Sequence, residues 1–450
     1  MKLISLGKRI LVVLFACAVV PAAQGGWGFC DDFNPSTFKG SCTNDVWKLS
    51  ISRVTVGGVT GFQITSYVSG SGVLDLTGFG AETGSGLEVI SLWREIFKSK
   101  TCITSFVGPS VIDIKRHAFY GATALASVTI SPDVSMVEYS AFEGATALSS
   151  FSPLVFPSLV TVPDAMFCKT AVTGDFSFPV ATTLGRNLFY KVAGVTSVSA
   201  PLCLTLGDQV FREATALTNF YGPSVTVLLP HPDNKTYGGA FRAATSLRSV
   251  TLSPNVDRLG DYCFSGASSL VELVPTNMAC VANLGNSTFG GTSMLQVPLS
   301  FSKLNSLAIN SFSGSGITSL SAPAATNIER AACSGCPNLK TVRVWGSQLT
   351  IAQEAFKNAP SGFVLEWLGP EAPGALGSSA IIVSSGLKAT IFVRQPTALE
   401  GWLLLKKRVP NATDKATEGY PGRCTKGVLD SNGNKAWICQ MPTGLLLLIR

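Results

Sequence analysis

Hydrophobic positions in the middle of the chain follow a pattern that returns about every 23 residues. Each unit has an aromatic residue, a short run of small residues and an aliphatic residue six positions after the aromatic, as in the segments 117–125, 140–148 and 239–247. Twelve positions, which we call the anchors, share the place of the aromatic: Phe97, Phe119, Phe142, Phe167, Phe189, Phe211, Phe241, Phe264, Phe289, Phe312, Cys333 and Phe356. A fixed period of this length predicts a solenoid in which each unit forms one coil.

A short strand is predicted after each run of small residues. Leu125, Val128 and Ile130 show the recurring order L-x-x-V-x-I, in which the alternating aliphatics point inward and the intervening residues point outward. Each strand can pair with its equivalent in the next coil, which predicts a parallel sheet along one face. The anchor rings should form a second internal stack, so Phe142→Ala is expected to cost about 3–5 kcal/mol.

The repeat unit resembles a known family. The order A-F-x-G-A-T-x-L-x-x-V-x-I-x-x-x-V, written by residues 141–148 and 125–134, is similar to the BspA-like leucine-rich repeat, and the resemblance covers 87–367. Cys336 stands where that family often has Cys after the glycine, whereas Cys333 departs from the pattern by replacing Phe. The resemblance implies a mainly β leucine-rich-repeat solenoid of about twelve coils, in a secreted or cell-surface protein that binds other proteins or host surfaces. It implies no reaction.

The first residues have the order of a secretory signal peptide. Lys2, Lys8 and Arg9 precede the apolar run 10–20, and small residues follow it. This run is shorter than the roughly 20 apolar residues that cross a bilayer, so a signal peptide over 1–25 is predicted, with no membrane span in the mature chain. Loss of the three basic residues lowers the formal charge from +7 to +4. Most of this excess lies after residue 403, so nucleic-acid binding is not predicted.

Caps are predicted on both sides of the repeats, because terminal coils would otherwise expose their cores. The N-terminal cap is assigned to 26–86 and the C-terminal cap to 368–450. An Asn-Gly turn at 432–433 between apolar arms predicts a hairpin in the second cap. Two local disulfides are expected in an oxidising compartment, and each closes a short loop: they are Cys30 with Cys42 and Cys424 with Cys439.

Three sequons, at Asn234, Asn286 and Asn411, are candidate glycosylation sites. The first lies in the turn-rich segment 230–236, within the longest coil. Insertions in repeat proteins often map to the binding face, so this segment is either a recognition loop or a glycosylated surface bulge.

Outward strand positions provide the candidate binding surface. Six of these eleven positions are Ser or Thr, which predicts a shallow, hydroxyl-rich face. The candidate ligand residues are Thr129, Ser152, Ser199, Tyr221, Thr251, Ser321 and Arg343. Tyr221 and Arg343 belong to the residue types that concentrate binding energy. The competing interpretation is that any solvated sheet uses small polar residues of this kind.

No constellation in the sequence predicts catalysis, a cofactor or a metal. His117 and His231 are the only histidines, and Cys333 with Cys336 lacks the second pair that a metal site needs. The predicted function is therefore a non-catalytic binding or adhesion scaffold that recognises an extracellular protein or glycan. Two alternatives stay open: ice or mineral binding by the Ser/Thr face, and a carbohydrate-active enzyme. The second would need grouped outward acids, and the clearest, Asp175 and Glu272, lie coils apart.

Overall fold

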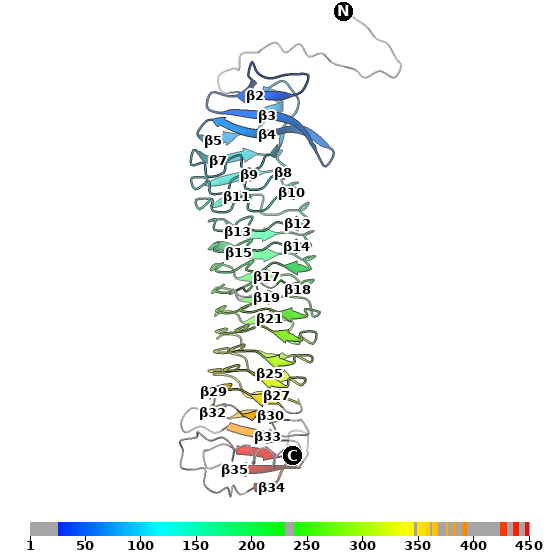
Figure 1. The fold of residues 1–450 in the computed structure, drawn as a ribbon, viewed down its shortest axis with the longest axis vertical. Coiled ribbons are helices and arrows are strands. Elements are labelled where there is room, and N and C mark those ends of the chain that lie inside the picture. Colours follow the sequence, from blue (N-terminus) through cyan, green and yellow to red (C-terminus); the bar gives the residue numbers. More distant parts are fainter. Residues whose placement is uncertain are drawn as a thin grey trace, which may run out of the picture.

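The computed structural model describes residues 26–229, 238–345, 349–360 and 362–367, followed by six strands between residues 375 and 449. These residues form a tall column of stacked coils with antiparallel strands at both ends (Figure 1). Each coil contains a longer strand, a two-residue strand and an anchor turn, in that order. The predicted mainly β solenoid is confirmed. The predicted signal peptide (1–25), the segment 230–236 and the sequons Asn234 and Asn411 lie outside the described residues.

The longer strands stack in parallel along one face of the column. They are β5 (Gly72–Asp75), β7 (Ile103–Gly108), β9 (Ser127–Ile130), β11 (Ser150–Ser152), β13 (Thr173–Ser177), β15 (Gly194–Ser199), β17 (Asn219–Tyr221), β19 (Ser249–Thr251), β21 (Glu272–Val274), β23 (Pro298–Ser300), β25 (Ser319–Ala322), β27 (Thr341–Val344), β30 (Phe363–Trp367) and β33 (Ala389–Val393). From β5 to β30 their inward apolar side chains are buried, as the period-2 pattern predicts.

The short strands form a second face. They are β6 (Val89–Leu92), β8 (Asp113–Ile114), β10 (Met136–Val137), β12 (Thr161–Val162), β14 (Thr183–Leu184), β16 (Thr205–Leu206), β18 (Val227–Leu228), β20 (Arg258–Leu259), β22 (Asn283–Leu284), β24 (Ser306–Leu307), β26 (Asn327–Ile328), β28 (Thr350–Ile351) and β31 (Ala375–Leu376). In the last coils the anchor segment also pairs, as β29 (Phe356–Ala359) with β32 (Ile381–Val383). Each coil is thus hydrogen-bonded to its neighbours on more than one side.

The anchor rings stack inside the column. From Phe97 to Phe312, ten rings make nine successive stacked contacts, with centroids 5.2–5.8 Å apart and planes inclined by 3–19°. Offset stacking of this kind adds about 0.5–1.5 kcal/mol per pair to the free energy of burial. Cys333 is buried in the next anchor position, so the stack ends at Phe312. The predicted internal aromatic stack is confirmed.

Each anchor lies between two residues with positive φ, one two positions before it and one two positions after it. The preceding set is Glu95, His117, Ser140, Ala165, Asn187, Gln209, Gly239, Tyr262, Ser287, Asn310, Ala331 and Glu354. The following set is Ser99, Gly121, Gly144, Lys169, Lys191, Glu213, Ala243, Gly266, Gly291, Gly314, Gly335 and Asn358. The chain therefore reverses direction twice around every anchor, mostly at a residue for which this conformation is costly.

The long-strand face is interrupted twice. Ser152 pairs with Thr129 of the preceding coil, but Ser177 of the following coil pairs with Val155. A second offset of the same kind lies between β21 and β23. Both fall in the coils that are 25 residues long, whose extra residues shift the register. The sequence predicted one continuous sheet of long strands. In the structure the long strands instead form three blocks, at residues 107–152, 177–274 and 298–366.

Antiparallel strands precede the first coil. They are β1 (Gly28–Phe29), β2 (Lys39–Thr43), β3 (Lys48–Val56) and β4 (Val59–Ser69), and β4 then pairs in parallel with β6. Trp47 and Phe62 are buried between these strands and the first coil. The helix α1, Phe79–Glu82, is short, and among the described residues no helix has the length and apolar character that a bilayer crossing requires.

The cysteines of both predicted disulfides lie on neighbouring strands. Cys30 directly follows β1, whose Phe29 pairs with Cys42 of β2. Both cysteines are free thiols in this structure, and the bridge between them stays a prediction. Burial raises the pKa of Cys42, a direction that favours the protonated thiol. At the other end, β34 (Cys424–Leu429), β35 (Lys435–Gln440) and β36 (Leu446–Ile449) run antiparallel, and the backbone of Cys424 lies opposite Cys439. The side chains of this pair are outside the described residues.

Candidate functional site: the Trp93–Tyr139 patch

The corner of each coil, four and three residues before the anchor, differs between the start and the middle of the column. Six side chains occupy this place in the first three coils, and we call them the Trp93–Tyr139 patch: Trp93, Arg94, Lys115, Arg116, Glu138 and Tyr139. Backbone hydrogen bonds hold these coils in register, from Lys115 N–H to the Leu92 carbonyl and from His117 N–H to the Tyr139 carbonyl. The patch is therefore carried by rigid, stacked backbone.

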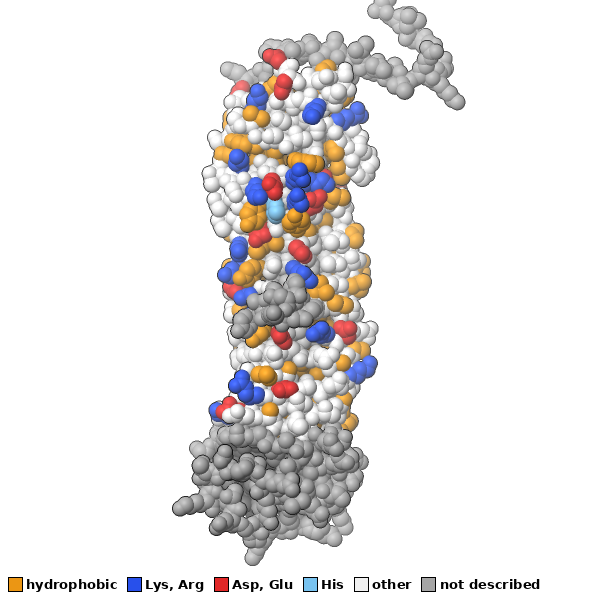
Figure 2. All heavy atoms as spheres, in the orientation of Figure 1, with side chains coloured by type: hydrophobic (Ala, Val, Ile, Leu, Met, Phe, Trp, Pro, Cys, Tyr) orange, Lys and Arg blue, Asp and Glu red, His pale blue; other side chains and the backbone are white. Residues whose placement is uncertain are grey.

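The patch surrounds a shallow hollow. Trp93 is 40 % exposed and Tyr139 is 43 % exposed, although most large side chains in these coils are buried. Together with Pro163, the six patch residues line a volume of about 520 Å³. Figure 2 shows basic and acidic side chains gathered around the histidine in the upper half of the visible face. Large, partly exposed aromatics beside arginine are the side chains that dominate binding energy at protein surfaces.

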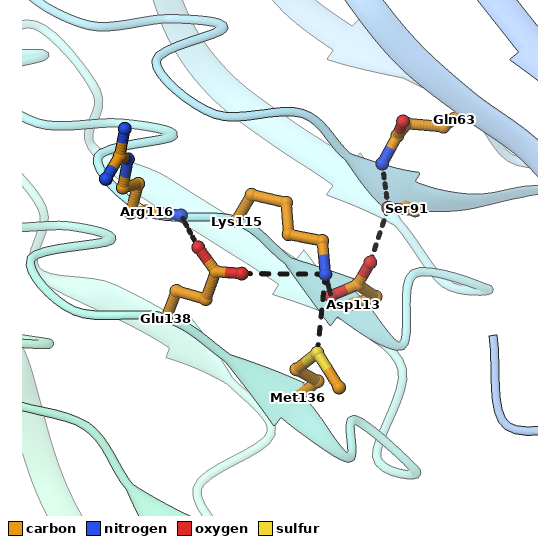
Figure 3. A network of polar contacts seen from close by, with 7 residues as sticks. All are labelled: Gln63, Ser91, Asp113, Lys115, Arg116, Met136 and Glu138. Atoms are coloured by element: carbon orange, nitrogen blue, oxygen red, sulfur yellow. Dashed lines mark hydrogen bonds and ion pairs between the residues drawn. The ribbon is translucent and has the colours of Figure 1, made fainter.

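Lys115 lies between two carboxylates, those of Asp113 and Glu138 (Figure 3). Its ammonium lies 3.1 Å from Asp113 and 3.6 Å from Glu138. The Asp113 carboxylate is buried, and it also accepts a hydrogen bond from Ser91, whose hydroxyl accepts one from the Gln63 amide. A buried carboxylate needs such partners, because leaving it unpaired costs several kcal/mol. This chain of contacts connects β4, β6 and β8 to the corner of the third coil.

The two arginines of the patch have no carboxylate partner among the residues that the structure describes. The Arg94 guanidinium lies over the Trp93 ring at 5.6 Å. The Arg116 guanidinium lies 6.0 Å from the Tyr139 ring and donates a hydrogen bond of 3.1 Å to the Tyr139 hydroxyl. The Arg116 backbone N–H donates to Glu138, which fixes the turn. Both cations are thus held against aromatic rings and keep most of their donors free.

His117 lies beside the patch and has a packing role. Its ring is 5.0 Å from the Tyr139 ring and 5.2 Å from the Tyr120 ring, and its Nδ1 is 3.5 Å from a Glu95 oxygen. The Lys98 ammonium, followed by His117, holds the pKa of the Glu95 carboxyl below its usual value. These contacts support Tyr139 from behind.

The predicted ligand face is distributed over the three blocks of the sheet. Thr129 and Ser152 lie in the first block, Ser199, Tyr221 and Thr251 in the second, and Ser321 and Arg343 in the third. Tyr221 is 50 % exposed and has Ser199 and Thr251 as its in-register neighbours. Arg343 instead forms a 2.6 Å ion pair with Glu366 of the next coil. Of the two expected hot spots, Tyr221 is exposed to solvent, whereas the charge of Arg343 is paired with Glu366.

The outward acids on the strands bind neighbouring coils. The Thr196 hydroxyl donates to Asp175 at 2.6 Å, and the Ser249 hydroxyl donates to Glu272 at 2.9 Å. The sequon residue Asn286 is exposed at a corner, where its N–H donates to Asp261. Each of these acids therefore already serves as an acceptor for the adjacent coil.

The Cys333 and Cys336 thiols are buried in the core. The Cys336 thiol donates to the Phe312 carbonyl at 2.9 Å, and burial raises its pKa to about 12. Burial also raises the pKa of Cys333. Within the described part of the chain, no three His, Cys, Asp or Glu side chains are grouped closely enough to hold a metal ion.

The patch was not predicted from the sequence, which pointed to the outward strand positions and to the segment 230–236. The signal was nevertheless present. Aligning the coils on their anchors places Trp93, Lys115 and Glu138 in one position, which is glycine in several later coils.

Comparisons with known proteins give a consistent assignment. The family model described as BspA type leucine rich repeat region, in six copies, matches residues 91–218 and 234–361. No curated protein matches the chain.

Several solved structures are similar to the chain. A leucine-rich repeat protein from Bacteroides ovatus has 14 % identity and a TM-score of 0.36, and the match covers 78 % of this chain and 94 % of that one. A leucine rich cell surface protein from Faecalibacterium prausnitzii has 16 % identity and a TM-score of 0.38, with 81 % and 97 % covered. The pneumococcal vaccine antigen PcpA has 14 % identity and a TM-score of 0.35, with 77 % and 99 % covered. Because the repeat model covers more than half of the sequence, the chain belongs to the BspA-type leucine-rich-repeat family.

Proposed function

We propose that this protein is an exported, non-catalytic binding scaffold, secreted or held at a cell surface, and that it recognises its ligand through the Trp93–Tyr139 patch. One observation carries the proposal. Two partly exposed aromatics and two guanidiniums without carboxylate partners in the described residues surround one hollow on stacked, rigid coils. Sites on regular elements hold their side chains more closely in place than sites on loops.

Export is supported by the first residues of the sequence. The basic start, the apolar run 10–20 and the small residues after it have the composition of a signal peptide. The membership of a leucine-rich-repeat family and the coil-to-coil bonds of Asp175 and Glu272 favour a scaffold over an enzyme. Ice or mineral binding is less favoured, because such a surface needs one regular array and the Ser/Thr face is divided into three blocks.

The proposal is tested with the mature chain, from residue 26, on protein and glycan arrays and on cells. The double variant Trp93→Ala/Tyr139→Ala removes the two aromatic walls, and we expect at least a tenfold loss of binding, or about 1.4 kcal/mol. Tyr221→Ala is the matched control, because it removes a tyrosine of similar exposure from the long-strand face.

The pair of variants separates two surfaces. Loss of binding with Tyr221→Ala and none with the double variant would transfer recognition to the long-strand face. Unchanged binding in both would exclude both surfaces. Circular dichroism of each variant checks that the coils are intact.

A further inference from the structure

The two arginines of the patch are placed to act together. They occupy the same corner position in adjacent coils, and the Glu95 N–H donates to the Arg116 carbonyl, so their backbones are one coil spacing apart, about 4.8 Å. Both line the same hollow. The Arg94 guanidinium is positioned by the Trp93 ring, and the Arg116 guanidinium by the Tyr139 ring and hydroxyl. Most N–H groups of both guanidiniums stay available to a ligand. A planar guanidinium matches the two oxygens of a carboxylate in bidentate geometry.

The charge of the hollow favours an anion. Three cations, Arg94, Lys115 and Arg116, stand against two carboxylates, Asp113 and Glu138, which leaves a net charge of +1. Because Lys115 contacts both carboxylates, the guanidiniums of Arg94 and Arg116 are the groups placed to receive an anion. Glu138 uses its two oxygens for Lys115 and for the Arg116 N–H, but each oxygen has a further lone pair that can accept a hydroxyl. The site therefore offers cationic donors for a carboxylate and one acceptor for a neutral hydroxyl.

The backbone around the hollow is already engaged. The N–H groups of Glu95 and His117 donate to the next coil, and those of Lys115 and Glu138 donate to the preceding one. An extended peptide gains much of its affinity from main-chain hydrogen bonds to a free strand edge, and no such edge borders the patch within the described residues. A sugar ring instead can lie with its C–H face on an aromatic ring and present its polar groups to side chains.

We infer that the Trp93–Tyr139 patch is a binding site for a carboxylate-bearing saccharide, with the carboxylate between Arg94 and Arg116 and a ring on Trp93 or Tyr139. This inference rests on the proposed function and adds the chemical class of its ligand. Uronic and sialic acids share the required chemistry, because both carry a carboxylate on a rigid ring. The hollow of about 520 Å³ lies within the range of small-ligand sites.

The test uses calorimetric titration of the mature chain with four ligands. These are a short oligogalacturonide, the same oligosaccharide after reduction of its carboxyl groups, a sialylated trisaccharide and an oligoglutamate peptide. We expect saturable binding of at least one carboxylated sugar and at least tenfold weaker binding of the reduced oligosaccharide. The first and third ligands distinguish uronic from sialic acid. Equal binding of the reduced sugar, or tighter binding of the peptide, would overturn the inference.

The variants locate the site. Arg94→Gln and Arg116→Gln should each weaken binding of the carboxylated sugar at least tenfold, and Arg116→Lys should restore little of it, because Lys lacks the planar fork. Arg186→Gln is the matched control. It stands three coils further on at the same corner position, with its backbone N–H likewise bound to a carboxylate, that of Asp164. A loss with Arg186→Gln equal to that with Arg116→Gln would indicate attraction to general positive charge and would overturn the site.

Failure of the inference can be told from failure of the proposed function. If no carboxylated sugar binds but Trp93→Ala/Tyr139→Ala still abolishes binding of another array ligand, the scaffold function stands and the saccharide assignment falls. If the double variant leaves every array interaction unchanged, both fall.

Discussion

The corner of the coil, four residues before the anchor, carries large side chains at the start of the column and glycine in several coils further along. In the first three coils it carries Trp93, Lys115 and Glu138, and their side chains form a polar, aromatic patch. In several later coils the same position is glycine, as at Gly185 and Gly207, where a Cβ would lie 2.4 Å from backbone atoms of the preceding coil. The same repeat therefore supports close backbone packing in one region and a side-chain surface in another. The repeat determines the scaffold, and departures from it determine which side chains the corner presents to solvent.

Among changes at the corner of the coil, removing the Lys115 charge should have the largest effect on stability. In Lys115→Met the buried Asp113 carboxylate loses its ion pair, and we expect the free energy of unfolding to fall by about 2–3 kcal/mol, less than for a fully enclosed pair. Urea denaturation measures this. The double variant Asp113→Asn/Lys115→Met should recover more than half of the loss, because no unpaired carboxylate remains. A single variant as stable as the wild type would show that the network in Figure 3 contributes nothing.

Adding one methyl group at a closely packed corner glycine should lower the stability of the column. Gly207→Ala would place a Cβ 2.4 Å from the Arg186 backbone nitrogen, so we expect a loss of about 1–3 kcal/mol. Gly260→Ala is the matched control at the same corner position, because no described atom beyond its chain neighbours lies within 4 Å of a Cβ at Gly260. That change should stay within about 0.5 kcal/mol. Equal effects of the two substitutions in thermal unfolding would contradict the close-packing explanation.

Residues with positive φ follow the anchors in both regions. Exchanging glycine and alanine at these positions should change the free energy of unfolding less than the corner substitutions do. Ala243 has φ of 55°, so Ala243→Gly is expected to raise stability by about 0.5–1 kcal/mol, the strain relieved less the entropy that glycine loses on folding. Gly144→Ala, at φ of 73°, should lower stability by a similar amount, since only Gly121 backbone atoms lie nearby, at 3.7 Å. Urea midpoints of both variants test this, and shifts of the same sign would be inconsistent with it.

The smallest expected effect is a pH dependence confined to the first coils. The pKa of Glu95 is lowered in the folded chain, chiefly by Lys98. A lowered folded pKa means that the contribution to stability is present above the unfolded value of about 4.3 and is lost as the pH falls through the folded pKa. The difference in melting temperature between the wild type and Glu95→Gln should therefore be seen at neutral pH and disappear in acid. A difference that grows in acid would contradict this.

Much of the scaffold could be predicted from the sequence, because the same order of anchor, small residues and alternating aliphatics recurs from coil to coil. The stacked rings follow from the anchor spacing, and burial of Val128 and Ile130 follows from alternation along the strand. The interruption at Ser152 was not foreseen, although the 25-residue coils mark its place, because a change of coil length does not show which residues leave the ladder. The positive φ at His117 or Gln209 has no signature in residue type.

The candidate site was less accessible to sequence reasoning than the fold. Trp93, Arg116 and Tyr139 come from three coils, and their grouping depends on the position of the corner within each coil rather than on any local motif. Arg343 shows the reverse case, since its residue type favoured a role in binding but Glu366 of the next coil neutralises it. Partners contributed by a neighbouring coil cannot be read from one unit alone.

The end of the ring stack at Phe312 has a consequence for how the column comes apart. In a linear array each coil is stabilised mainly by its two neighbours, so total stability is a sum over interfaces. The interface between Phe312 and Cys333 lacks the ring contact that the nine preceding interfaces have, so we expect it to be weaker than they are. Under an axial pull, or on warming, we expect the coils after Phe312 to separate first and the ring-stacked segment to melt later as a block. The Trp93–Tyr139 patch lies in the ring-stacked segment, so we expect it to stay folded after the coils beyond Phe312 have separated.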